Sequence, residues 1–148
     1  MRVWWSTVRS ILLGWIALFG IAYLVQRPLL RLAARLLDSS WLPTAQLALA
    51  CAGLAATGWV VARWSGPRPS IAVFIFAVML AVSNFGLEPA IDIPWLFKLL
   101  LDSLQNARYL QSFALDLVTH VLLFGGLFAG AFFGQAHEQT EARIFRLN

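Results

Sequence analysis

Residues 117–134 read LVTHVLLFGGLFAGAFFG, which is 18 consecutive positions without a formally charged side chain. Three more runs have the same character, at residues 10–26, 41–62 and 70–87. Crossing the hydrocarbon core of a bilayer takes about 17–25 apolar residues, and a helix satisfies every backbone polar group within lipid. The sequence therefore predicts an all-α fold, a bundle of four transmembrane helices.

The composition agrees with lipid as the solvent. Hydrophobic residues make up 60% of the 148 residues and charged residues only 12%, against about 45–50% and 25% in soluble domains. The net charge is +4. Because the basic residues flank the apolar runs, they favour lipid headgroups over nucleic acid as their partner. We expect a single membrane domain over residues 1–148, with a polar tail at 135–148.

The connecting segments 27–40 and 94–108 are predicted to be amphipathic helices that lie at the membrane interface. Arg27, Arg31 and Arg35 recur every four residues, so they form one stripe on the first of these helices. The alternative is that residues 27–40 extend the first span beyond the bilayer.

Four crossings would place both segments on the same side of the membrane, where their net charges are opposite. Three arginines and one aspartate give residues 27–40 a net charge of +2. Two basic and four acidic residues, Glu88, Asp92 and Asp102 among them, give residues 88–116 a net charge of −2. We therefore expect the two segments to dock as a charged platform on one bilayer face. The alternative is that headgroups solvate each segment separately.

The orientation follows from a small difference in basic residues. The side that holds both termini has six of them and the opposite side has five, so the positive-inside rule favours cytoplasmic termini. Arginine outnumbers lysine ten to one, and alanine and leucine are abundant. This composition indicates a bacterium with a GC-rich genome and hence the inner membrane.

Small residues recur at every fourth position of two predicted spans, and such ridges let helix backbones approach closely. They are Gly126, Gly130 and Gly134 in the last span and Ala48, Ala52 and Ala56 in the second. We expect the two ridges to pack against each other inside one bundle. The alternative is that they serve self-association or contact with a partner subunit.

Asp116 and His120 form an ionisable pair one helical turn apart at the start of the last span. Such residues are functional candidates, and this pair is suited to relaying a proton or pairing with a substrate cation. The alternative is structural: a carboxylate favoured by the dipole at a helix start, followed by a hydrogen-bonded histidine. Asn84 is a further candidate for bonding across helices. Asp-x-x-x-His at the start of a last span resembles VanZ-like small membrane proteins, and the resemblance covers these two positions only.

The sequence offers no residue set for a metal site, a cofactor or nucleophilic catalysis. His120 and His137 are 17 residues apart, about 25 Å along a helix, so they do not share an ion on one straight helix. Cys51 is the only cysteine and has no base near it in the sequence. We therefore expect no cofactor and no metal.

Three functions remain, and the sequence favours the first, a non-enzymatic accessory or assembly subunit of a membrane complex. Its partner would be another membrane protein or further copies of the same chain. The second is a small oligomeric transporter or channel with Asp116 and His120 on its pathway. The third is a membrane enzyme that acts on lipid and uses His120 with the acids Glu88, Asp92 and Asp116.

Overall fold

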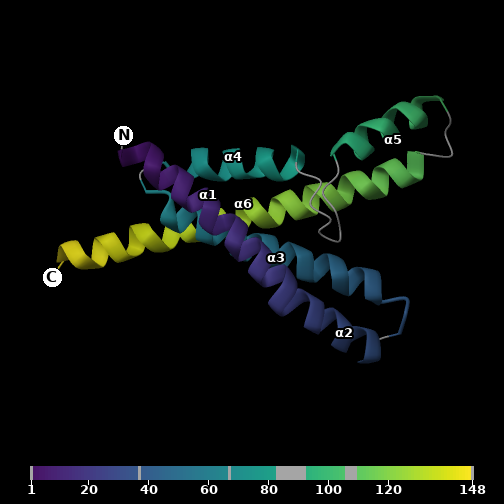
Figure 1. Ribbon diagram of the computed structural model, residues 1–148, viewed down its shortest axis with the longest axis horizontal. Helices are drawn as coiled ribbons and strands as arrows, with labels where there is room; N and C mark the ends of the chain where they lie inside the picture. Colours follow the sequence, from purple (N-terminus) through teal and green to yellow (C-terminus); the bar gives the residue numbers. More distant parts are fainter. Residues whose placement is uncertain (1, 37, 67, 83–92, 106–109, 148) are drawn as a thin grey trace.

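The computed structural model is a bundle of helices of very different lengths (Figure 1). Every regular element among the described residues is a helix, as the all-α prediction required. The structure describes residues 2–36, 38–66, 68–82, 93–105 and 110–147.

Three helices are long and apolar enough to cross a membrane, so the prediction of a helical membrane protein is supported. They are Trp4–Leu36, Leu42–Trp64 and Leu110–Ala136. The second of them is α3, and the third lies within α6, Leu110–Leu147, which also takes in most of the predicted polar tail. The remaining predicted span, residues 70–87, is represented by α4, Pro69–Val82, a shorter apolar helix of 14 residues.

The first long helix is continuous through three elements. These are α1 (Arg2–Gly20), the π-helix η1 (Ile21–Gln26) and α2 (Arg27–Leu36). Residues 27–36 therefore extend the first span, as in the alternative interpretation. Pro28 explains the π-helix, because it has no N–H and its ring would crowd the carbonyl of Leu24 in a regular α-helix. The wider turn, in which the Arg27 N–H donates to the Ala22 carbonyl five residues back, relieves this conflict.

α3 is the central helix and contacts α1, η1, α2, α4 and α6. α1 runs antiparallel to it, because Gly14 lies against Val61 whereas the later residues Ile21 and Gln26 lie against Gly53. α4 returns alongside α1, and α6 runs in the same direction as α3 (Figure 1). The four helices α1, α3, α4 and α6 therefore alternate in direction along the chain.

One hydrophobic core forms where α1, α3, α4 and α6 meet. Phe76 of α4 is fully buried there, and its ring centroid lies 5.3 Å from that of Trp15 of α1. Val61, Leu123 and Leu127 are also fully buried. These contacts hold the four helices together.

The helices diverge from this core toward one end of the molecule. α2 and the start of α3 extend to one corner, and α5 (Ile93–Gln105) and the start of α6 extend to another (Figure 1). α2 packs on α3, while α5 packs on α6 and buries Leu99. The described parts of segments 27–40 and 88–116 therefore do not dock on each other, because each packs on its neighbouring long helix.

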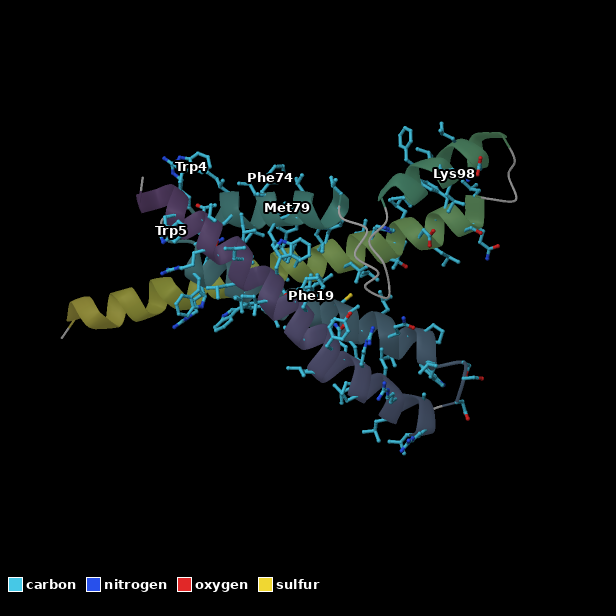
Figure 2. The ribbon with its side chains drawn as sticks, in the orientation of Figure 1. Trp4, Trp5, Phe19, Phe74, Met79 and Lys98 are labelled. Atoms are coloured by element: carbon cyan, nitrogen blue, oxygen red, sulfur yellow. The ribbon has the colours of Figure 1, made fainter. Side chains whose placement is uncertain are left out.

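Both termini lie at the opposite end of the molecule (Figure 1). Trp4 and Trp5 mark this end and are 72% and 70% exposed, and Lys98 lies on α5 at the other end (Figure 2). Exposed tryptophans at a helix terminus are typical of the zone between lipid and water.

Candidate functional site

The closest helix contact in the structure joins the glycine ridge of α6 to the backbone of α3. A Cβ atom added to Gly126 would lie 2.8 Å from the carbonyl oxygen of Cys51, and one added to Gly130 would overlap the carbonyl oxygen of Ala55. A Cβ on Gly134 would lie 3.1 Å from the carbonyl oxygen of Trp59. Only glycine permits backbones to approach this closely.

The contact is reciprocal. A Cβ atom added to Gly58 of α3 would overlap the carbonyl oxygen of Leu127 of α6. Each helix thus places a glycine against the backbone of the other helix. Because residue numbers rise together on both sides of this contact, α3 and α6 are parallel.

The face of α3 that meets the glycine ridge is not the predicted one. Ala48, Ala52 and Ala56 are exposed, so the expected pairing of the two ridges is corrected. The face in contact carries Cys51, Ala55, Gly58 and Ala62, also small residues, at a spacing of four, three and four. Residues at such intervals share one side of an α-helix, as the predicted alanines also do, so Gly58 is the sequence signal that distinguishes this face.

Beyond this contact α3 and α6 separate and leave an open cleft of about 410 Å³. The cleft lies between the first turns of α3 and the first third of α6. Its lining residues are Pro43, Thr44, Gln46, Leu47, Asp116 and Thr119. Asp116, one of the predicted candidates, therefore lines a cleft together with polar and apolar residues of another helix.

His120 lies one turn after Asp116 and is only 6% exposed. Its Nδ1 atom is 2.7 Å from the backbone carbonyl oxygen of Asp116. Since a carbonyl oxygen only accepts hydrogen bonds, Nδ1 carries the proton and donates it. The lone pair of the neutral ring is then on Nε2.

The hydroxyl groups that line the cleft have oxygen atoms that can accept hydrogen bonds. Thr119 Oγ1 donates its hydrogen to the carbonyl oxygen of Leu115 at 2.9 Å, so its lone pairs stay available as acceptors. Thr44 adds a second hydroxyl and Gln46 an amide. Among the described residues that line the cleft, none is basic or aromatic.

The described residues of the charged platform predicted from the sequence lie on two different helices. Arg27, Arg31 and Arg35 are exposed along α2, and the Arg27 guanidinium lies 4.3 Å from the centroid of the Tyr23 ring. Asp102 is half-buried on α5. The other three candidates, Asn84, Glu88 and Asp92, lie outside the described residues.

One contact between helices was not predicted from the sequence. Gln26 Nε2 donates to the backbone carbonyl oxygen of Leu49 at 2.9 Å, in the space that the missing side chain of Gly53 leaves open. Gln26 marked the end of the first charge-free run and gave no sign of its partner. Gly53, one of two glycines in the second run, was the available signal, because a glycine within an apolar helix permits close approach.

No group of three or more metal-binding side chains occurs within the part of the chain searched for one, which is limited to the described residues. Comparison with known proteins finds no matching family model, no similar curated protein and no similar solved structure. The functional argument therefore rests on the geometry of α3 and α6 and on the cleft between them.

Proposed function

We propose that the chain crosses the bacterial inner membrane four times, with both termini in the cytoplasm. The parallel orientation of α3 and α6 supports this topology. If both helices cross in the same direction, the chain between them must return through the bilayer, and α4 is the apolar helix in that position. Its 14 residues span about 21 Å of a hydrocarbon core that is about 30 Å thick. α3 spans about 35 Å with its 23 residues.

We further propose that the protein is a non-enzymatic accessory or assembly subunit of a membrane complex. The observation that carries this proposal is that, among the described residues, the helices close against one another in only one half of the bundle. At the end away from the termini, α3 and α6 diverge (Figure 1). The first half of α6 there exposes large apolar side chains, among them Leu115, Val118 and Val121, which is 63% exposed. A helix of a partner would fill this open half.

Helices in lipid associate through close packing and polar contacts, because lipid chains are as apolar as leucine. The open half provides both kinds of surface. Its apolar side chains suit packing, and the cleft beside Asp116 supplies polar groups. The closed half supplies the rigid framework that holds these surfaces in place.

The test is purification of the full-length protein from its native membrane in a mild detergent, followed by mass spectrometry of the proteins that accompany it. We expect one membrane protein in stoichiometric amount. Val121→Ser, on the open half, is expected to lose this partner, whereas Phe74→Ser on α4, also exposed, is expected to retain it. A lone monomer, or a complex of this chain only, would contradict the accessory role.

A second candidate function is a small oligomeric transporter or channel. The observation in its favour is that Asp116 lines an open cleft next to the buried His120. A transporter would lose transport in both Asp116→Asn and His120→Ala. An accessory subunit would keep its partner in His120→Ala, which distinguishes the two functions.

A further inference from the structure

The cleft between α3 and α6 lies at a defined depth. Pro43 and Thr44 belong to the first turn of α3, which begins at Leu42. Asp116 lies six residues after Leu110, the first residue of α6, which is about 9 Å along the helix. In the four-span topology proposed above, on which this placement rests, the cleft is at the headgroup level of the bilayer face opposite the termini.

The charge of the cleft selects a cation. Asp116 is the one charged residue among the described lining residues, so the cleft carries a negative charge when its carboxyl group is ionised. A carboxylate has two oxygens with about four acceptor positions. It therefore accepts bonds from a ligand in addition to those it makes within the protein.

The neutral lining groups restrict the kind of cation. Thr44, Thr119 and the Gln46 amide oxygen offer further acceptors from two helices. A primary ammonium group has three N–H donors that match such a set. A quaternary ammonium group has none and is recognised by aromatic rings, and none of the described lining residues is aromatic.

The apolar lining residues fit the rest of such a ligand. Pro43 and Leu47 cover one side of the cleft, where the carbon atoms next to an amine can lie. The volume of about 410 Å³ falls within the range of about 300–1,000 Å³ that is usual for sites of small molecules. The cleft is also open, as a site must be if a lipid headgroup enters it from the side.

We propose that the cleft binds a primary ammonium group, with Asp116 as the charged partner and Thr44, Gln46 and Thr119 as hydrogen-bond acceptors. Two sources supply this chemistry at a membrane surface. One is the ethanolamine headgroup of a lipid, and the other is a small amine from the aqueous phase.

The experiment uses the full-length protein in detergent, with native mass spectrometry of bound lipid as the readout. The probes are phosphatidylethanolamine, phosphatidylcholine and phosphatidylglycerol of identical acyl chains, and phosphoethanolamine as the soluble probe. We expect a molecule that carries a primary ammonium group to be retained in preference to the choline and glycerol lipids. We expect Asp116→Asn to weaken that retention about tenfold, because it removes the charge-assisted hydrogen bonds.

Two further variants keep the experiment decisive. Asp102→Asn removes a half-buried carboxylate on α5 that does not line the cleft, and its retention should equal that of the wild type. Thr119→Val preserves the shape of the side chain and removes one acceptor, so retention should fall several-fold. It provides the test if Asp116→Asn does not fold, as judged from its helical circular dichroism.

The outcomes separate the two sources. Retention of phosphatidylethanolamine that depends on Asp116 identifies the lipid, and retention of phosphoethanolamine that depends on Asp116 identifies a soluble amine. Equal retention of all three lipids without Asp116-dependent retention of phosphoethanolamine, or equal retention by the wild type and both cleft variants, would overturn the proposal. A failure of the four-span topology would show instead in the side of the membrane from which residues near the cleft are labelled.

Discussion

Gly130 of α6 lies so close to Ala55 of α3 that a Cβ atom on the glycine would overlap the alanine's carbonyl oxygen. A carbonyl oxygen cannot move aside as a flexible side chain can, because it belongs to the helix backbone. The contact therefore fixes the distance between the two helices and the level at which they cross. The contact thereby positions the parts of α3 and α6 on either side of that level, and the cleft between them.

Gly130→Ala is expected to destabilise the protein by about 1–3 kcal/mol, because the added methyl group has to push the two backbones apart. The matched control is Gly125→Ala, since nothing lies within 4 Å of a Cβ atom at Gly125. That variant should be neutral or up to about 1 kcal/mol more stable, because alanine is the better helix former. Unfolding in mixed micelles by titration with a denaturing detergent measures both. Equal stability of the two variants would show that α3 and α6 do not cross at Gly130.

Gln26→Leu is expected to cost about 0.6–1.5 kcal/mol, because it removes the hydrogen bond to the Leu49 carbonyl with little change in side-chain size. This hydrogen bond links η1 to α3. Gln111→Leu is the control, since Gln111 is exposed near the start of α6. The same detergent titration applies, and a Gln111→Leu variant at least as destabilised as Gln26→Leu would contradict the role of this bond.

The existence of the helices could be predicted from the sequence because it depends on local composition. A charge-free run such as residues 117–134 has no stable alternative to a helix in lipid. The ends of the helices were less predictable. α6 extends from Leu110 to Leu147, well beyond that run, because its polar flanking residues are also helical. A helix does not have to end at the membrane boundary.

The choice of helix faces could not be predicted with the same certainty. Ala48, Ala52 and Ala56 share one face of α3, and the neighbouring face with Cys51, Ala55 and Gly58 is equally smooth. Spacing alone does not rank two such faces. The ranking comes from Gly58, which allows the backbone of α6 to approach at Leu127, and this preference depends on a helix almost 70 residues further along the chain. The cleft beside Asp116 follows from the same crossing.

The four-span topology predicts which residues face each side of the membrane. In a Cys51→Ala background, single cysteines at Ser40 and Gln111 should react with a membrane-impermeant maleimide added to spheroplasts. A cysteine at Arg68 should react only after the membrane is permeabilised. All three native residues are exposed, so access to the reagent depends on the membrane and not on burial.

Two patterns of labelling would contradict this topology in different ways. If Gln111 and Arg68 were labelled from the same side, α4 would not cross, and α3 and α6 could not both cross in the same direction. If all three sides were reversed, the four crossings would stand and the termini would face the periplasm. The first pattern would also remove the cleft from the headgroup level proposed for it.

The hydrogen bond of His120 predicts its tautomer. Because Nδ1 lies 2.7 Å from the Asp116 carbonyl oxygen, the neutral ring should carry its proton on Nδ1. Long-range ¹⁵N–¹H correlation spectra of histidine-labelled protein in micelles distinguish the two tautomers, and a His137→Gln variant assigns the signal to His120. Asp116→Asn should leave the tautomer unchanged, since the acceptor is the backbone carbonyl. A proton on Nε2 instead would mean that Nδ1 is not a donor, and Nδ1 would then be the nitrogen that takes up a proton in any relay.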